Sequence, residues 1–296
     1  MPNIGFIGLG NMGAPMAANL VKSGDRVVGF DLVAASRQAG ADQGVEIASN
    51  AKATVEDADI VVTMLPAGEH VRSVWTDVLP SAKPGTLFID CSTIDVTSAR
   101  AAHALAAERG IAALDAPVSG GVAGAKAASL TFMVGGAAAA FVRGKPILER
   151  MGKRVVHCGD AGNGQVAKIC NNMILGASMI AVSEAFVLGE RLGLSHQALF
   201  DVASASSGQC WSLTSYCPVP GPVPASPANN AYRPGFAAAL MLKDLKLARE
   251  AADGVNVENA LGAHAAEIYA QFADAGHGAA DFSGIINFVR ERSKRG

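Results

Sequence analysis

Residues 3–13 read Asn3-Ile4-Gly5-Phe6-Ile7-Gly8-Leu9-Gly10-Asn11-Met12-Gly13, an apolar run that leads directly into the pattern G-x-G-x-x-G. The apolar run predicts a buried strand, and the small and apolar residues at 17–21 predict a helix behind the glycines. In that context Gly8 permits a tight turn, Gly10 lets a pyrophosphate approach the backbone, and Gly13 lets the helix pack closely on the strand. The stretch therefore predicts a dinucleotide site, with the phosphates at the amino end of the helix.

Asp31 ends the next apolar run, residues 26–31, and lies 18 residues after Gly13. A carboxylate at this place accepts hydrogen bonds from the adenosine ribose 2′-OH and repels a 2′-phosphate. We therefore expect NAD rather than NADP as the cofactor, the alternative being an acidic residue that merely ends a strand. The residues expected at the pyrophosphate and the ribose are Gly8, Leu9, Gly10, Asn11, Met12, Gly13 and Asp31.

The composition is that of an ordinary soluble protein. The chain has 296 residues, of which 50% are hydrophobic and 17% charged, and its formal net charge is −2. This length favours two domains over one large domain, and the charge balance gives no reason to expect a nucleic-acid partner.

The five cysteines are widely spaced and form no C-x-x-C or Cys/His pattern, which predicts a reduced protein with no metal site. The first predicted strand begins at the start of the chain, so we expect no targeting segment and a cytoplasmic protein. The most apolar segment, residues 173–183, is too short to span a bilayer, so no membrane partner is expected.

Strand and helix signals alternate up to residue 157, which predicts a parallel sheet with right-handed crossovers. The remaining strands are expected at residues 45–48, 59–66, 85–90, 111–114, 129–134 and 154–157, with helices at 34–41, 68–78, 95–109 and 137–151. Ligands of such sheets bind beyond the carboxyl ends of the strands. We therefore expect one crevice to be lined by residues 8–13, 64–66 (Met64, Leu65, Pro66), 91–93 and 116–121.

From residue 164 onward the sequence shows only helix signals. Helices are expected at residues 165–192, 195–206, 237–253, 258–275 and 281–292, with a proline-rich loop near residues 218–227. The predicted fold class is α/β: a Rossmann-type dinucleotide-binding domain followed by an all-α domain joined by a long helix. The expected boundaries are 1–163 for the NAD-binding domain and 164–296 for an all-α substrate and oligomerisation domain, in which residues 164–192 form the linking helix.

Lys168 and Asn172 are one turn apart on the long predicted helix, so they share one face. A lysine near the start of a helix opposes the macrodipole, and here its neighbours are apolar. Hydride transfer from an alcohol to a nicotinamide needs a base for the hydroxyl proton, and a lysine whose pKa is lowered by burial can supply it. The alternative is a lysine that snorkels from a half-exposed face.

Three other stretches are candidates for the same site. Ser119-Gly120-Gly121 offers a hydroxyl and backbone N–H groups for an anion, or is a plain turn. Lys243-Asp244 interrupts an apolar helix and either forms a buried ion pair or reaches the cofactor. Trp211 and Phe236 offer an apolar wall for a substrate methyl group, or pack between helices. The six histidines form no ligand cluster.

Together these motifs resemble the β-hydroxyacid dehydrogenase family over nearly the whole chain. The matching motifs are residues 6–13, Asp90-Cys91-Ser92-Thr93-Ile94, Asp115-Ala116-Pro117-Val118-Ser119-Gly120-Gly121, Gly162-Asn163-Gly164-Gln165-x-x-Lys168-x-x-Asn171-Asn172 and Leu242-Lys243-Asp244-Leu245. The stretch from Cys210 to Phe236 is similar to the subgroup that oxidises 3-hydroxyisobutyrate to methylmalonate semialdehyde in valine breakdown.

The resemblance implies roles for particular residues. Lys168 is the implied catalytic acid/base, while Ser119, Gly120 and Asn172 would contact the substrate. Thr93 and Lys243 would lie at the nicotinamide, and Leu65, Pro66 and the residue four positions later would border the cofactor. That last position is His70 here, where the subgroup often has asparagine. The family also implies a homodimer or homotetramer.

Two rival functions remain open at this stage. The first is reduction of another small semialdehyde, such as succinic or tartronic semialdehyde. The second is a catalytically inactive dinucleotide-binding scaffold, which would be expected to lack the helix lysine, whereas Lys168 is present.

Overall fold

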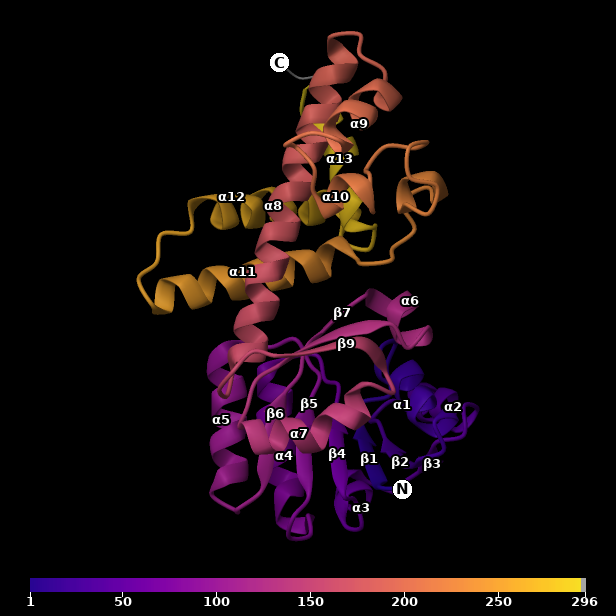
Figure 1. The fold of residues 1–296 in the computed structure, drawn as a ribbon, viewed down its shortest axis with the longest axis vertical. Helices are drawn as coiled ribbons and strands as arrows, with labels where there is room; N and C mark the ends of the chain where they lie inside the picture. The colour runs from indigo at the N-terminus through magenta and orange to yellow at the C-terminus, as the bar shows by residue number, and fades with distance from the viewer. Residues whose placement is uncertain (294–296) are drawn as a thin grey trace. The chain divides into compact units, whose positions relative to one another are not determined.

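The computed structural model describes residues 1–293, and a six-stranded parallel sheet organises the first part of the chain (Figure 1). Its strands in chain order are β1 (Asn3–Ile7), β2 (Arg26–Phe30), β3 (Glu46–Ile47), β4 (Ile60–Thr63), β5 (Leu87–Asp90) and β6 (Ala112–Asp115). They lie in the order β3-β2-β1-β4-β5-β6, which is the Rossmann order and confirms the predicted fold class.

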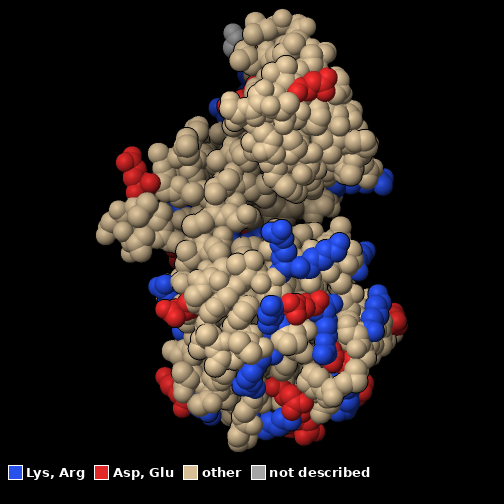
Figure 2. Space-filling model, viewed as in Figure 1, with Lys and Arg blue, Asp and Glu red and all other residues tan. Residues whose placement is uncertain are grey.

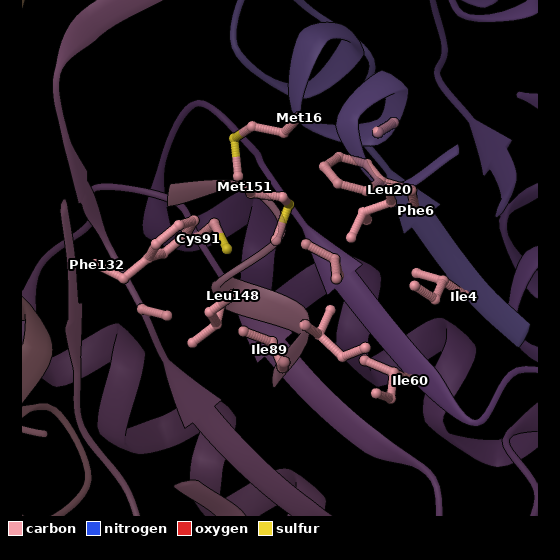
Figure 3. Close-up of a cluster of buried hydrophobic side chains, with 14 of the residues drawn as sticks. Ile4, Phe6, Met16, Leu20, Ile60, Ile89, Cys91, Phe132, Leu148 and Met151 are labelled. Carbon is pink, nitrogen blue, oxygen red and sulfur yellow. The ribbon is translucent and has the colours of Figure 1, made fainter. Parts of the chain in front are cut away.

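Helices cover both faces of this sheet because successive strand residues point to opposite sides. Phe6 and Ile89 belong to one buried cluster, shown in Figure 3, whereas Ile7 and Phe88 belong to another. The helices of this part are α1 (Gly13–Lys22), α2 (Ala34–Ala41), α3 (Ala51–Val55), α4 (Gly68–Val78), α5 (Val96–Ala107), α6 (Gly121–Lys126) and α7 (Ala138–Leu148), with a 3-10 turn η1 (Leu79–Ser81).

A second, three-stranded sheet follows the first one. It consists of β7 (Val118–Ser119), β8 (Leu130–Val134) and β9 (Gly152–His157), and β7 pairs with β8 antiparallel. The sequence predicts β8 and β9 but not their separate sheet. A strand of two residues carries no hydrophobic periodicity, so β7 has no recognisable signal.

The rest of the chain is helical. Its elements are α8 (Asn163–Arg191), α9 (His196–Ser204), α10 (Trp211–Thr214), η2 (Pro227–Asn230), α11 (Ala238–Gly254), α12 (Ala260–Phe272), the π-helical turn η3 (Ala273–His277), η4 (Phe282–Gly284) and α13 (Ile285–Arg292). The chain forms two compact units, Met1–Lys168 and Ile169–Gly296, so the first turn and a half of α8 belongs with the sheets.

Two buried clusters form the core of the second unit. One joins α8, α11 and α12 through residues such as Met179, Met241 and Tyr269, and the other joins α8 to α10 and α13 through Phe186 and Ile286. Within residues 1–293, α8 is the one helix whose length and mean hydropathy of 1.5 would suit a membrane span. These contacts make α8 the central helix of the second unit.

The proline-rich loop after α10 is held by its own polar side chains. Asn229 accepts a hydrogen bond from the N–H of Gly221 (3.0 Å) and donates to the carbonyl of Val223 (2.9 Å). Tyr232 donates its hydroxyl to the carbonyl of Pro218 at 2.8 Å. The loop is therefore a packed part of the second unit.

Candidate functional site

The glycine turn after β1 is shaped so that only glycine fits at two of its positions. Gly8 has φ +98°, and a Cβ atom there would overlap the carbonyl oxygen of Met64. A Cβ atom at Gly13 would overlap the carbonyl oxygen of Gly8. Gly10, by contrast, is exposed and has open space where its side chain would be, so its backbone is accessible to a pyrophosphate. These residues fit a dinucleotide.

Asp31 directly follows β2 and is tied to the glycine turn. One carboxylate oxygen accepts a hydrogen bond from the N–H of Leu9 (2.8 Å), and the other accepts one from the N–H of Val33 (2.8 Å). The carboxylate is therefore held at the carboxyl end of β2, next to the residues that would face the cofactor.

The loops after β4 and β5 are joined by a buried hydrogen-bond network. Asp90 Oδ1 accepts from the hydroxyls of Thr63 (2.7 Å) and Ser92 (2.6 Å). The Ser92 hydroxyl in turn accepts from the N–H of Leu65 at 2.8 Å. This network fixes the positions of Leu65 and of the residues around Thr93, which are two of the stretches predicted to border the cofactor.

The buried carboxyl group of Asp90 has a raised pKa. Burial raises its pKa to about 6, and the neighbouring carboxylate of Asp115 adds to the rise, although hydrogen bonds from Ser92 and Thr63 oppose it. Its second oxygen has no hydrogen-bond partner within residues 1–293. The negative charge on this side chain is therefore poorly compensated at neutral pH.

Asp115 holds the start of α8 against the sheet. Its oxygens accept hydrogen bonds from the backbone N–H groups of Gly162 (2.8 Å) and Gln165 (3.0 Å), and His103 lies 3.0 Å from it. A Cβ atom at Gly164 would overlap the carbonyl oxygens of Met133 and Asp115, so this turn packs directly on the strands. A carboxylate at a helix amino end is also favoured by the helix dipole.

The in-register ends of the strands bring these groups to one edge of the sheet. Ile7 pairs with Thr63, Thr63 with Asp90, and Asp90 with Asp115. The glycine turn and the loops after β4 and β5 follow directly from these ends, and the first turn of α8 is hydrogen-bonded to Asp115 at the end of β6. The strand order therefore gathers these segments at the edge of the sheet where the sequence predicts the crevice.

Lys168 lies in the second turn of α8, and only 5% of it is exposed. Such burial is rare for lysine and argues against a side chain that merely covers an apolar surface. Asn172, the next residue on this face, belongs to the second unit and is 2% exposed. Its amide donates to Asp244 at 2.5 Å and accepts from Asn171 at 2.9 Å. Asp244 therefore fixes the orientation of Asn172.

The remaining predicted residues lie on several elements of the two units. Gly120 (φ +135°) and Gly121 (φ +61°) follow Ser119 at the end of β7, and their conformations favour glycine. Thr93 and Lys243 are half-buried, the former beside the network of Asp90 and the latter on α11 in the second unit. His70 is exposed on α4, and Asn11, Met12 and Pro66 lie in the loops after β1 and β4.

Trp211 and Phe236 lie at the two ends of one aromatic row in the second unit. Trp211 stacks on Tyr216 (4.9 Å between centroids), Tyr216 stacks on Phe282 (5.3 Å), and Phe236 meets Phe282 edge-on (5.8 Å). Asp281 accepts hydrogen bonds from the Tyr216 hydroxyl and from the N–H of Phe236. Trp211 is 51% exposed, so one end of the row presents an open apolar face.

Sequence patterns identified Lys168 and Asn172 but gave no function to Gln165, Asp90 or Asp115, although all three stand inside quoted motifs. For Lys243-Asp244 the sequence left open a buried ion pair or a contact with the cofactor, and the structure shows that Asp244 accepts a hydrogen bond from Asn172. No group of three or more histidine, cysteine or acidic side chains in residues 1–293 is arranged to hold a metal ion.

Two family profiles match the two parts of the chain. The profile described as the NAD binding domain of 6-phosphogluconate dehydrogenase matches residues 3–159. The profile described as NAD-binding of NADP-dependent 3-hydroxyisobutyrate dehydrogenase matches residues 162–289.

Related proteins match over almost their whole lengths. A Mycobacterium tuberculosis protein named probable 3-hydroxyisobutyrate dehydrogenase is 55% identical, covering 99% of each chain. A Pseudomonas aeruginosa NAD-dependent L-serine dehydrogenase is 46% identical, covering 96% of each chain. The solved structure of Mycobacterium tuberculosis 3-hydroxyisobutyrate dehydrogenase with L-serine superposes with a TM-score of 0.96, at 55% identity, covering 98% of this chain and 99% of that one.

The Rossmann sheet, the glycine turn and the helical second unit define the class of the molecule, an NAD-binding oxidoreductase of two units. Within that class, the chain belongs to the 3-hydroxyisobutyrate dehydrogenase family. The family resemblance inferred from the motifs is confirmed.

Proposed function

We propose that this protein oxidises 3-hydroxyisobutyrate to methylmalonate semialdehyde with NAD, as in the breakdown of valine, and that Lys168 accepts the hydroxyl proton. The observation that carries the proposal is the burial of Lys168 in the second turn of α8, whose first turn is bonded to the loop after β5. When bound, the nicotinamide supplies the acceptor for the hydride from the hydroxyl-bearing carbon.

The proposed roles of the other residues follow from their environments. Ser119 and the N–H groups of Gly120 and Gly121 would bind the substrate carboxylate, since these glycines have no side chains of their own to shield the N–H groups. Asn172, oriented by Asp244, would hold the substrate or the lysine. Trp211 and Phe236 would contact the methyl group. The proposed cofactor contacts are residues 8–13, Asp31, Met64, Leu65, Pro66, His70, Thr93 and Lys243.

L-serine is the second candidate substrate, because one relative is named for it and another has been solved with it. L-serine and 3-hydroxyisobutyrate share a hydroxymethyl group, a neighbouring carbon and a carboxylate. They differ at the middle carbon, which carries an ammonium group in serine and a methyl group in 3-hydroxyisobutyrate. Lys168 and the anion-binding loop at residues 119–121 would act in the same way on both substrates. The preference between them therefore depends on the protein surface that contacts the substituent on the middle carbon.

A substrate panel tests the proposed function. We expect kcat/KM with NAD to be highest for 3-hydroxyisobutyrate and lower for L-serine, glycerate and 4-hydroxybutyrate, because an apolar wall favours a methyl group over a charged or hydroxyl group. A higher kcat/KM for L-serine would assign the protein to serine oxidation. A preference for glycerate or 4-hydroxybutyrate would favour tartronic or succinic semialdehyde as the physiological partner, and no NADH with any of them would support the scaffold alternative.

Replacement of Asp31 tests the proposed preference for NAD. We expect Asp31→Ala to lower the ratio of kcat/KM for NAD to that for NADP by about 10- to 100-fold, since a charge-assisted hydrogen bond is worth roughly 1.5–3 kcal/mol. Asp31→Asn is the matched control for folding, because its side-chain oxygen can still accept from the N–H of Leu9. An unchanged ratio in both variants would remove Asp31 from the ribose site.

We also propose that residues 164–296 supply the substrate and oligomerisation functions of a cytoplasmic homodimer or homotetramer. The second unit exposes large apolar side chains, among them Ile174 and Leu188 on α8 and Leu192 directly after it. Figure 2 shows a wide surface of this unit that is free of charged residues. Such surfaces favour association, and light scattering in solution measures the particle mass; a monomer would contradict the proposal.

A further inference from the structure

Gln165 lies in the first turn of α8 and is completely buried. Its side-chain amide donates to the carbonyl of Ser92 at 2.8 Å and accepts from the N–H of Ile94 at 3.2 Å. These two backbone groups lie on either side of Thr93. The glutamine amide therefore bonds to one carbonyl and one N–H of this segment, as the backbone of a paired β-strand does. The backbone N–H of Gln165 donates to Asp115 at 3.0 Å.

These bonds connect the turn of α8 that carries Lys168, the proposed proton acceptor, to the loop around Thr93, which is proposed to border the nicotinamide. Lys168 is three residues after Gln165, so both side chains lie on the same side of α8. Thr93 is the residue proposed to border the nicotinamide. Every residue in the connection, from Leu65 through Ser92 and Gln165 to Lys168, belongs to the first unit. The distance between Lys168 and the loop after β5 is therefore set within the first unit.

We propose that Gln165 is a positioning residue that fixes Lys168 relative to the nicotinamide loop. This inference depends on the proposed role of Lys168 and extends it. The amide touches neither substrate nor cofactor in this assignment. It acts by holding the turn of α8 that carries the lysine against the backbone on either side of Thr93, so that the proton acceptor stays within reach of the alcohol.

Gln165→Leu tests the proposal because leucine keeps much of the volume and removes both hydrogen bonds. We expect kcat to fall by about 10- to 100-fold, since a misplacement of about 1 Å can cost 10²-fold. The KM for NAD should change by less than about threefold, because the glycine turn and Asp31 are untouched. Thr86→Val is the matched control. Thr86 precedes β5, at the opposite end of this strand from Ser92 and Thr93. The substitution removes a buried hydroxyl that donates to the carbonyls of Ala58 (3.0 Å) and Lys83 (2.9 Å), and it should leave kcat unchanged.

Gln165→Glu adds a readout that a merely structural role would not give. A protonated glutamic acid can donate to Ser92 and accept from Ile94, whereas the carboxylate can only accept. Burial and the carboxylates of Asp115 and Asp90 favour the protonated form. The ammonium of Lys168 on the same side of α8, and the His103 paired with Asp115 when it is charged, oppose them. The ratio of variant to wild-type kcat should therefore be highest near pH 6 and fall by about tenfold or more towards pH 9.

The outcomes separate this proposal from the proposed function. A normal kcat for Gln165→Leu would overturn the positioning role. If Gln165→Leu fails to fold, a ratio for Gln165→Glu that is independent of pH would overturn the role instead. A large rise in the KM for NAD with unchanged kcat would also overturn it, since Gln165 would then order only the cofactor loop. The role of Lys168 is tested by its own substitution, so a defective Lys168→Ala together with a normal Gln165→Leu would refute the positioning role alone.

Discussion

Lys168→Ala is expected to lower kcat by about 10²- to 10⁴-fold, the usual contribution of a positioned acid or base. The residue is 5% exposed and lies one turn before the buried Asn172. Removing its amine leaves the alcohol without a proton acceptor, whereas the glycine turn and Asp31 stay intact. NAD should therefore still bind with a Kd within a fewfold of the wild-type value, which fluorescence titration measures.

Two further variants make this result specific. Lys168→Met keeps most of the side-chain length and should show the same loss of kcat with less disturbance of packing. Lys246→Met replaces an exposed lysine on α11 and should leave kcat unchanged. Turnover of Lys168→Ala near the wild-type value would refute the proposed mechanism.

Asp90→Asn is expected to remove a pH-dependent loss of stability: between about pH 4 and pH 7, its free energy of unfolding should rise relative to the wild type by on the order of 2–3 kcal/mol. The folded-state pKa of Asp90 is raised from 3.8 to about 6, so the folded protein holds a proton that the unfolded chain releases. The stability that this proton contributes is complete below about pH 4 and is lost as pH rises through 6. Asparagine does not titrate, so it avoids this loss.

The measurement is the difference in free energy of unfolding, variant minus wild type, between about pH 4 and pH 7. The side-chain oxygen of the introduced asparagine can still accept from Thr63 and Ser92, although its NH₂ group replaces an oxygen of Asp90 that has no hydrogen-bond partner within residues 1–293. That mismatch adds a penalty that does not depend on pH. The difference should shift in favour of the variant as pH rises. A difference that stays constant across this range would show that Asp90 is not held at a raised pKa.

The sequence was sufficient to predict the elements that have a clear period. The strand–turn–helix around Gly8 to Gly13, the helix at 68–78 and the long helix from residue 163 all carry apolar patterns that local rules detect. The helix expected at residues 95–109 is another example, and its first residue, Asp95, caps α5 by accepting from the N–H of Ser98 at 2.6 Å. These features depend on neighbours in the chain, which a sequence displays directly.

The features that could not be predicted depend on partners far away in the chain. Gln165 bonds to residues more than 70 positions earlier, and Asn172 bonds to Asp244, 72 positions later. A polar residue inside an apolar strand or helix indicates that some partner exists, since buried polar groups are hydrogen-bonded, but it does not say which one. The separate sheet of β7, β8 and β9 was missed for a related reason, because β7 depends on pairing with β8 and not on its own pattern.

Tracing the hydride tests the central claim most directly. 3-Hydroxyisobutyrate carrying two deuterium atoms at its hydroxymethyl carbon is incubated with NAD and the wild-type protein, and the mass of the NADH formed is measured. The proposed reaction predicts NADH that contains one deuterium atom, because the hydride passes directly from that carbon to the nicotinamide. NADH without deuterium, or no NADH from this substrate, would contradict it.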